Sequence, residues 1–457
     1  MHGAPAASRN PARPRGTLSD SRFPYSFRKK PPRMKTSIWL LLIALVGPLG
    51  AAVAAWPHTV PHADPHTDND AEPTAANERP TRLDPATNAR WVVDLPGPGA
   101  STPVVWRDRL FLTSEIDDAN GVICLTTEGQ QLWRQKFGER VAGKHRNASG
   151  ANPSPVTDGK RVVAYFKDTT LACFSVDGEP LWRVNLAEEL GEGKLWWDLG
   201  TSPVLTSAGV LVAAMHEGES YLATFDIQTG EVVWKQPRNY ECATESDQSY
   251  TTPAVVMLDG VETVVTLGAN HLTGHDAKTG RLLWECGGIN PDNQPMWRNI
   301  ASAAVAGGIA VVPHGRGELL TAFRLGGSGD VTQSARMWGL RGVGSDSPTP
   351  CVVDGRVYVL GDKGTVTCVD LETGEKLWTD QLPRTRAKYF SSPVVIGDLL
   401  YCISEDGGAV VSRIDNGLQS PVKTELGDIV VATPVPIDND LLVRTRTRLY
   451  RFAGEEE

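Results

Sequence analysis

The sequence predicts an all-β protein, an eight-bladed β-propeller built of four-stranded antiparallel blades. Three observations carry this prediction. A Ser/Thr-Pro motif, with Ser-Ala in one unit, marks eight positions at steps of 41 to 52 residues, tryptophan recurs at nearly the same step, and the residues between them alternate apolar and polar with a period of two. Period-two alternation is typical of strands, and a step of about 40–50 residues is typical of a propeller blade.

The first motif marks the start of each unit, where Ser or Thr usually precedes Pro and small apolar residues, as in "TPVV". One unit has "SAAV" in its place. The eight residues are Thr102, Ser154, Ser202, Thr252, Ser302, Thr349, Ser392 and Thr433. Residues 90–457 therefore hold eight units of about 46 residues each, as expected for four short strands joined by tight turns.

The second motif ends each unit with tryptophan, and three units share "DIQTGEVVW", "DAKTGRLLW" and "DLETGEKLW". Asp370 can accept backbone N–H bonds in a turn, and Gly374 can take the positive φ that such a turn requires. The repeated tryptophans, predicted to be structural and buried between blades, are Trp91, Trp133, Trp182, Trp234, Trp284, Trp338 and Trp378. Val422 takes the eighth position.

The two ends of the repeat region predict how the ring closes. The segment 90–95 is a tryptophan strand with no strands before it, and the chain ends on "RLYRFAG", the third strand of a unit. We therefore expect the N-terminal strand to complete the last blade, because this removes two exposed sheet edges.

The N-terminal region divides into three segments. Residues 1–33 form a basic, Pro- and Arg-rich leader, and Met34 is an alternative start. Residues 34–55 include an uncharged stretch from residue 36 that ends in small residues, which predicts a signal peptide or a membrane anchor. Residues 56–89 are polar and predict a disordered linker. We expect an exported protein, periplasmic or secreted, with 36–55 as its possible anchor.

The net charge limits which kinds of partner are expected. The net charge is −9, although residues 1–35 alone carry nine Lys or Arg and one acidic residue. The remainder is strongly acidic, which argues against nucleic acid as a partner. We expect a monomer.

The alternation of tryptophan-ended Asp-x-x-Thr-Gly with Ser/Thr-Pro-Val over residues 90–457 resembles the pyrroloquinoline quinone (PQQ) repeat. Two classes share this repeat. Quinoprotein alcohol dehydrogenases hold PQQ and calcium in the propeller funnel, whereas proteins of the outer-membrane assembly factor BamB family hold no cofactor and bind partner proteins. The chain lacks adjacent cysteines and a Cys-x-x-Cys-His motif, which favours the BamB-like class. It also lacks the lipid-bearing cysteine after the apolar stretch, which departs from BamB.

These features lead to one functional expectation and two alternatives. We expect an exported, non-catalytic, cofactor-free propeller that binds envelope proteins or a cell-envelope ligand. One alternative is a PQQ- and calcium-dependent alcohol dehydrogenase; the other is a sugar- or peptide-binding propeller. No Ser/His/Asp arrangement, phosphate loop or paired-carboxylate motif stands out in the sequence.

The cysteines and histidines could be disulfide partners or metal ligands, or they could have a purely structural role. Cys124, Cys173 and Cys368 share one repeat position and are predicted to be small buried strand residues, while Cys242 and Cys286 could form a disulfide. The histidines have no metal-ligand spacing, so no metal site is predicted. They are His216, His271, His275 and His314.

Acidic stretches beginning at Asp117 and Glu245 lack the spacing of a calcium loop and are predicted to be solvated. Asn147 fits a glycosylation pattern that is common by chance.

The long connections between units predict the binding face, because they emerge together and carry aromatic and cationic residues that dominate interfaces. The candidate binding residues are Arg146, Trp196, Trp197, His216, Tyr240, Tyr250, Trp297, Arg298, His314, Arg316, Arg341, Arg386, Lys388 and Tyr389. In the alternative interpretation Trp196, Trp197 and Trp297 fold back over their own loops.

Overall fold

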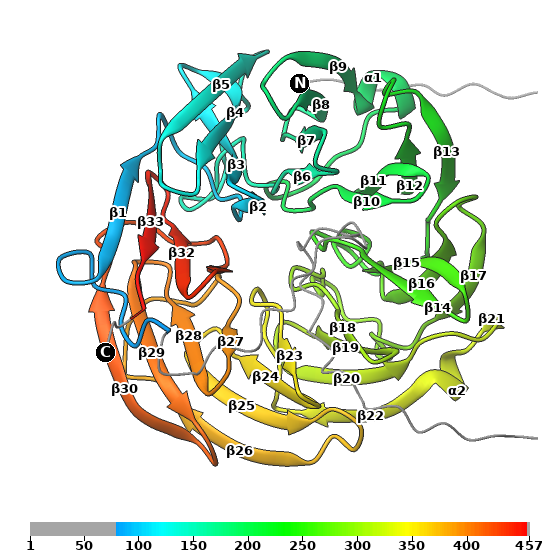
Figure 1. Cartoon of the computed structure of the whole chain (residues 1–457). Coiled ribbons are helices and arrows are strands. Elements are labelled where there is room, and N and C mark those ends of the chain that lie inside the picture. The colour runs from blue at the N-terminus through cyan, green and yellow to red at the C-terminus, as the bar shows by residue number, and fades with distance from the viewer. Residues whose placement is uncertain (1–78, 455–457) are drawn as a thin grey trace, which may run out of the picture. The chain divides into compact units, whose positions relative to one another are not determined.

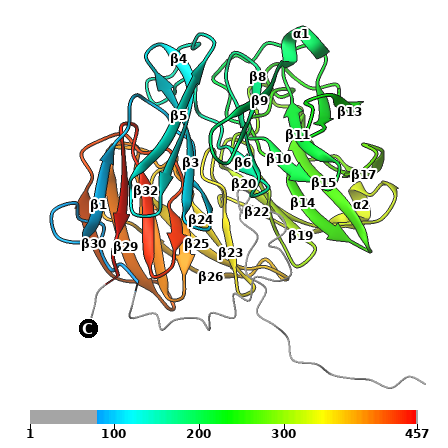
Figure 2. The same ribbon diagram turned by 45° about the horizontal axis from the view of Figure 1, so that its top comes forward.

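The computed structural model describes residues 79–454, which form eight antiparallel sheets arranged in a ring (Figures 1 and 2). This confirms the eight-bladed β-propeller. Blades are numbered here in chain order. Within each blade the first strand lies innermost, and the last strand lies at the outside of the ring.

The first four blades follow one another along the chain. Blade 1 comprises β2 (Val104–Trp106), β3 (Arg109–Ile116), β4 (Ala119–Thr126) and β5 (Gln131–Phe137). Blade 2 comprises β6 (Val156–Thr157), β7 (Arg161–Tyr165), β8 (Thr170–Ser175) and β9 (Pro180–Asn185). Blade 3 comprises β10 (Val204–Thr206), β11 (Gly209–Ala214), β12 (Tyr221–Phe225) and β13 (Val232–Pro237). Blade 4 comprises β14 (Ala254–Leu258), β15 (Val261–Gly268), β16 (His271–Asp276) and β17 (Leu282–Cys286).

The remaining blades follow the same order, and two short helices lie in connections. Blade 5 comprises β18 (Ala304–Ala306), β19 (Ile309–His314), β20 (Leu319–Arg324) and β22 (Arg336–Arg341). Blade 6 comprises β23 (Cys351–Val353), β24 (Arg356–Leu360), β25 (Thr365–Asp370) and β26 (Lys376–Gln381). Blade 7 comprises β27 (Val394–Ile396), β28 (Leu399–Ile403), β29 (Gly408–Ile414) and β30 (Leu418–Glu425). The helices are α1 (Leu186–Leu190) and α2 (Thr332–Ala335).

Blade 8 closes the ring with strands from both ends of the chain. It comprises β31 (Val435–Ile437), β32 (Asp440–Arg444), β33 (Arg448–Phe452) and, at the outside, β1 (Ala89–Asp94). β1 pairs antiparallel with β33, with Val93 opposite Leu449. The predicted closure is confirmed: β1 covers the outer edge of β33 and becomes the outer strand of the blade.

The predicted linker ends earlier than residue 89. Leu83 is fully buried in the core shared by blades 7 and 8. The Tyr401 hydroxyl donates to the Pro80 carbonyl at 2.9 Å, and Thr424 donates to the Leu83 carbonyl at 2.7 Å. The prediction of disorder is therefore wrong from about Pro80 onward, because one leucine and two backbone carbonyls tie this segment to the propeller. The leader, the signal segment and the rest of the linker lie outside the described residues.

The Asp-x-x-Thr-Gly turn is a docking surface for the preceding blade. In blade 6, Asp370 Oδ1 accepts the Glu372 and Thr373 N–H groups at 3.1 and 2.8 Å, and Gly374 has φ of 74°. The Trp338 ring of blade 5 lies over Gly374, where an added Cβ would come within 2.6 Å of it. Trp338 Nε1 also donates to the Leu371 carbonyl at 2.9 Å. The repeated tryptophan and the repeated turn thus meet across the blade boundary.

Five tryptophans dock in this way, each with its indole N–H 2.9–3.1 Å from a backbone carbonyl of the following blade. The Trp–Gly pairs are Trp91 with Gly129, Trp133 with Gly178, Trp182 with Gly230, Trp234 with Gly280 and Trp338 with Gly374. Because the rings cover an outer turn rather than the inner core, all five are half-buried. They lie against the neighbouring blade, but they are half-buried there rather than buried.

Three positions depart from this pattern, and two of the departures have a structural cause. Trp284 is buried, at 2% exposure, because an insertion in blade 5 adds β21 (Gly329–Asp330) beside it. Trp378 is half-buried and its Nε1 has no partner. In blade 7, Val422 stands where other blades have tryptophan. The outer strand of blade 8 is β1, which no turn joins to β33, so blade 8 has no turn glycine on which a tryptophan ring could pack.

The Ser/Thr-Pro motif forms a second ring at the axis. The backbone N–H of each Ser or Thr donates to the side-chain hydroxyl of the equivalent residue in the next blade, at 2.9–3.2 Å, for seven of the eight steps. A hydroxyl is required because the buried N–H would otherwise lack an acceptor. The motif therefore joins the blades at their innermost edges, as the tryptophans do at the outside.

The cysteines are all free. Cys124, Cys173 and Cys368 are buried strand residues as predicted, and Cys242 and Cys286 form no disulfide. Among residues 79–454, the structure contains no helix with the length and apolar character needed to cross a membrane.

Candidate functional site

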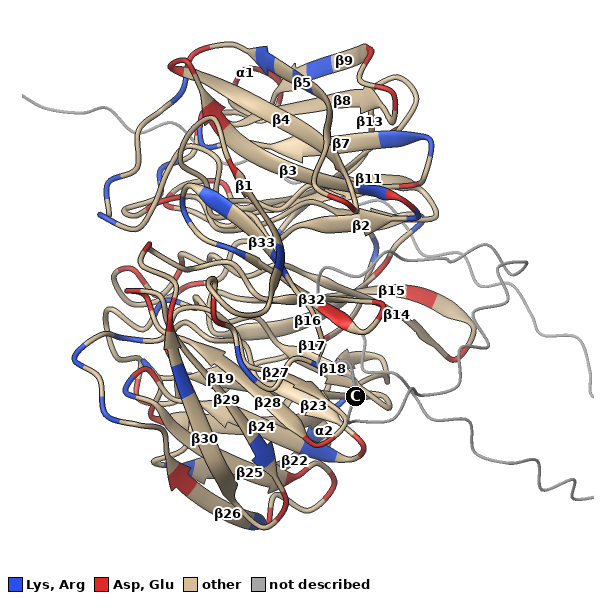
Figure 3. Ribbon diagram, turned by 60° about the vertical axis from the view of Figure 1, so that its left-hand side comes forward, with Lys and Arg blue, Asp and Glu red and all other residues tan. Residues whose placement is uncertain are grey.

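A cavity of about 440 Å³ lies on the propeller axis. All eight Ser and Thr residues of the axial ring line it, together with residues from the long connections between blades. Charged residues lie mainly in loops, in turns and near strand ends, while most of the strand ribbon is uncharged (Figure 3). The face that carries the long connections is therefore the candidate functional site.

Five of the fourteen predicted binding residues line this cavity. They are Trp197, Tyr250, Arg298, Arg316 and Lys388. His145, from the same loop as Arg146, also lines it, and the sequence gave no binding role to Asn147, Asp198, Asp346, Asp362 and Phe390, which line it too. The regular spacing of the Ser/Thr-Pro motif marked the start of each blade, but it gave no reason to expect its hydroxyls in the wall of a cavity.

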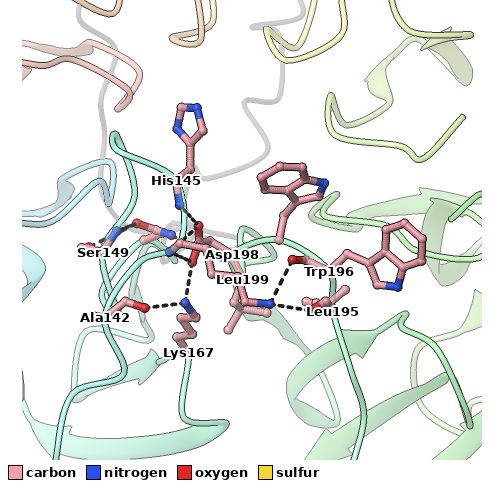
Figure 4. A network of polar contacts seen from close by, with 12 residues as sticks. Ala142, His145, Ser149, Lys167, Leu195, Trp196, Asp198 and Leu199 are labelled. Carbon is pink, nitrogen blue, oxygen red and sulfur yellow. Dashed lines mark hydrogen bonds and ion pairs between the residues drawn. The ribbon is translucent and has the colours of Figure 1, made fainter. Parts of the chain in front are cut away.

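Asp198 fastens two loops beside the cavity (Figure 4). It accepts the Lys144 N–H at 2.8 Å and the His145 N–H at 2.8 Å, and it pairs with Lys167 Nζ at 2.5 Å. The Lys167 and Asp198 side chains are only 10% and 7% exposed. A buried pair with this many hydrogen bonds fixes geometry, because losing either member would leave the other charge unpaired.

The loop between β5 and β6 reaches across the cavity mouth from blade 1 to blade 7. Arg146 and Asn147 donate to Glu405 Oε2 at 2.8 and 2.5 Å, and the Lys388 N–H donates to its other oxygen at 3.2 Å. Burial alone would raise the pKa of Glu405, but the hydrogen bonds from Asn147 and Lys388 and the nearby Arg146 hold this pKa below its usual value. The carboxylate is therefore charged and anchors the loop.

The prediction that Glu245 is solvated is wrong, since this residue is only 2% exposed. It accepts the Trp197 indole N–H at 2.9 Å and pairs with Arg298 Nη1 at 3.3 Å. The Arg298 guanidinium also lies 5.8 Å from the Trp197 ring centre. Trp197 is thus held by a neighbouring loop rather than folded over its own. Asp117, by contrast, is exposed as predicted and pairs with Lys136 at 3.2 Å.

The opposite wall carries a second set of charges. Arg316 pairs with Asp346 at 3.1 Å, and Asp362 accepts the Asp346 N–H at 3.0 Å. Burial raises the pKa of Asp362. Lys388 lines the cavity with an exposed side chain. The rim therefore combines two ion-paired arginines, an exposed lysine and an indole.

The other predicted residues lie away from the cavity wall. Arg146 lines a neighbouring groove, Trp196 donates to Glu217 at 3.3 Å, and Tyr240 donates to Glu285 at 2.7 Å while stacking on His271. Trp297 lies beside Gly315, and Arg341 and Arg386 are exposed.

Three more predicted residues are buried. Tyr389 is 1% exposed in the core, His314 Nε2 lies 3.0 Å from the Thr321 hydroxyl, and His216 lines a separate cavity. Tyr389 and His216 lie in loops but turn inward, and His314 is the last residue of the buried strand β19, none of which the repeat spacing reveals.

The four histidines do not converge. Burial lowers the pKa of His275 and of His314 to about 4, so both rings are neutral at pH 7. Within the part of the chain that the structure describes, no three His, Cys, Asp or Glu side chains are placed to hold a metal ion.

Comparisons with known proteins agree with this architecture. The family model of the outer membrane protein assembly factor BamB matches residues 76–236 and 167–425. The BamB of Burkholderia pseudomallei is 25% identical over 292 residues, which cover 63% of this chain and 68% of that protein.

Two solved structures share the fold at low identity. BamB from Moraxella catarrhalis superposes with a TM-score of 0.58 at 16% identity, covering 81% of this chain and 98% of that one. The quinohemoprotein alcohol dehydrogenase of Comamonas testosteroni superposes with the same TM-score at 12% identity, covering 82% and 79%. The structural likeness shows the fold alone. The family-model match extends over most of the propeller, so the chain belongs to the BamB family of PQQ-like β-propellers.

Proposed function

We propose that this protein is an exported, non-catalytic interaction module of the cell envelope that binds a partner protein through the loop face around its axial cavity. The names of its relatives support the class of partner, because they are assembly factors of the outer membrane. Export rests on the apolar stretch at 36–55, which lies outside the described residues.

One observation carries the proposal: the rim residues are held in place before any partner arrives. Trp197 is fixed by Glu245, and Arg316 is fixed by Asp346. The loop from blade 1 is fixed to Glu405 in blade 7. Binding through such residues loses little conformational entropy, and Trp and Arg are the residue types enriched in interface hot spots.

The test begins with capture of partners from envelope extract by the tagged full chain, followed by a titration with the purified partner. Arg316→Ala and Lys388→Glu are expected to weaken binding by about 1–3 kcal/mol each, with unchanged melting temperatures. Arg324→Ala is the matched control, since its exposed pair with Glu372 lies at an outer turn. Wild-type affinity in both rim variants would place the interface elsewhere.

The residues of the cavity fit a quinone cofactor with calcium poorly. The lining includes no cysteine, and two of its cations, Arg298 and Arg316, are already paired with Glu245 and Asp346. The three lining aspartates form no three-ligand group for a metal within residues 79–454. Dye-coupled alcohol oxidation after addition of PQQ and calcium would overturn the non-catalytic proposal. A glycan and peptide array tests the alternative of a sugar- or peptide-binding propeller.

A further inference from the structure

A second cavity, of about 220 Å³, lies between blades 2 and 3. Its walls come from β7, β11 and β12, and from the connection that follows α1. None of the eight ring hydroxyls at the axis lines it, although Trp197 and Leu199 line both cavities. The tyrosines and the histidine of this cavity play no part in the proposed function.

The polar part of this cavity is largely buried. Tyr165 and Tyr221 are each 3% exposed and His216 is 9% exposed, and all three line the cavity. Among the described residues His216 Nδ1 is a buried atom with no hydrogen-bond partner. Native proteins satisfy nearly all buried polar groups, so this unpartnered nitrogen beside two tyrosine hydroxyls indicates a polar cavity that an occupant can fill.

The charges around the cavity select the sign of that occupant. Three lysines line it, namely Lys144, Lys167 and Lys194, and no Asp or Glu is among its lining residues. Lys167 is neutralised by Asp198, and Lys194 lies 3.8 Å from Glu217. Lys144 Nζ donates to the Leu195 and Trp196 carbonyls at 3.1 and 2.9 Å, neither of which cancels its charge. Among the described residues Lys144 is therefore the lining lysine that no carboxylate pairs with, and its charge favours an anionic group beside it.

The protonation states of Tyr165 and Tyr221 favour a bound group that accepts hydrogen bonds. Burial raises the pKa of Tyr221 to about 12 and raises that of Tyr165 further, so both hydroxyls keep their protons at pH 7 and can donate. Burial lowers the pKa of His216, so its ring is neutral. Two O–H donors and an ammonium group suit a carboxylate, which only accepts hydrogen bonds when ionised.

Much of the remaining wall is apolar, and the volume of the cavity limits the size of the ligand. Leu195, Leu199 and Met215 line it, and Gly193 lies directly against the His216 ring, where a Cβ would clash with Nε2. An apolar cavity of about 150 Å³ accepts benzene. A cavity of 220 Å³ thus has room for a ring or a short chain with one carboxylate.

We propose that this cavity binds a small organic monocarboxylate, with its carboxylate at the Tyr165 and Tyr221 hydroxyls and Lys144 and its apolar body against Leu195, Leu199 and Met215. The site goes beyond the proposed partner interface, because none of these polar groups belongs to the rim of the axial cavity.

The test is a calorimetric titration of the full chain with benzoate and hexanoate, compared with benzyl alcohol and hexanol, which have similar apolar bodies but no charge. Saturable binding of at least one acid is expected, with the matching alcohol at least about tenfold weaker. Tyr165→Phe and Tyr221→Phe should each weaken binding of the acid by about tenfold while leaving the alcohols unaffected. Tyr389→Phe is the control, because Tyr389 is equally buried but lies outside this cavity.

Three results would overturn the proposal: no saturation by either acid up to roughly 10 mM, equal affinity for acid and alcohol, or unchanged acid affinity in both tyrosine variants. Lys144→Met provides a readout if a tyrosine variant fails to fold, since Lys144 is exposed and its loss should weaken only the acids. A partner interface at the rim would survive all three results, so the two proposals fail independently.

Discussion

The docking of tryptophan on the neighbouring turn predicts a specific energetic coupling between Trp234 and Gly280. The Trp234 ring lies over Gly280, and its Nε1 donates to the Ala277 carbonyl at 3.1 Å. A half-buried indole removes roughly 130 Å² of apolar surface from water, worth about 3 kcal/mol. Trp234→Ala should therefore lower the free energy of unfolding by about 3 kcal/mol, with little cavity penalty because solvent can fill the outer site.

Gly280→Ala tests the same contact from the other side. Gly280 has φ of 73°, and an added Cβ would come within 2.5 Å of the Trp234 ring. In the wild-type background this substitution introduces both backbone strain and a clash, and in the Trp234→Ala background only the strain remains. We expect a coupling of about 1–2 kcal/mol between the two changes, because residues in direct contact are not additive.

Urea denaturation followed by circular dichroism measures all four proteins of this cycle. Val233→Ala is the control, because Val233 is adjacent on β13 but 47% exposed, and its loss should cost no more than about 0.5 kcal/mol. Additive effects of Trp234→Ala and Gly280→Ala would refute the docking argument.

Three further predictions concern the axis, the N-terminal segment and blade closure. Ser202→Ala should cost about 1–3 kcal/mol, because the buried Ser154 N–H loses its acceptor at 2.9 Å. Leu83→Ala should cost about 2–4 kcal/mol, since Leu83 is fully buried. Asp440→Asn should lower the melting temperature, because Asp440 pairs with Arg451 at 2.5 Å and both side chains are buried.

The measurements for these three are thermal and urea unfolding, with Ser202→Thr, which keeps the hydroxyl, as the control at the axis. Near-wild-type stability of Ser202→Ala would show that the axial hydrogen bonds are replaceable. If Leu83→Ala leaves the free energy of unfolding unchanged, the segment before β1 does not pack against the propeller in solution.

Asp440 also gives a pH dependence with a definite sign. Burial opposes its ionisation, but hydrogen bonds from Arg90 and Arg451 outweigh this and lower its pKa. A carboxyl with a lowered pKa stabilises the fold above its unfolded pKa of about 3.9, and the contribution is lost as the pH falls through the folded pKa. Wild type should therefore lose more stability than Asp440→Asn on acidification. Equal acid sensitivity of the two proteins would contradict this assignment.

The sequence determined the features that repeat. Each blade uses the same local chemistry, so the positions of Ser202 and Trp234 could be placed by counting, and Asp370 and Gly374 by turn preference. Ring closure by β1 followed from the strand that each end of the chain lacked. These predictions succeeded because they depend on short-range rules applied eight times.

Only the tertiary structure decided what meets at the axis and between blades. Arg146 and Glu405 are 259 residues apart, and Glu245 is buried only because Trp197 and Arg298 arrive from other loops. The same holds for Tyr165 and Tyr221, which face one cavity from adjacent blades. Loop residues follow no period, and whether a charge or hydroxyl is solvated depends on partners brought together by the closed ring, which is why local sequence could not place them.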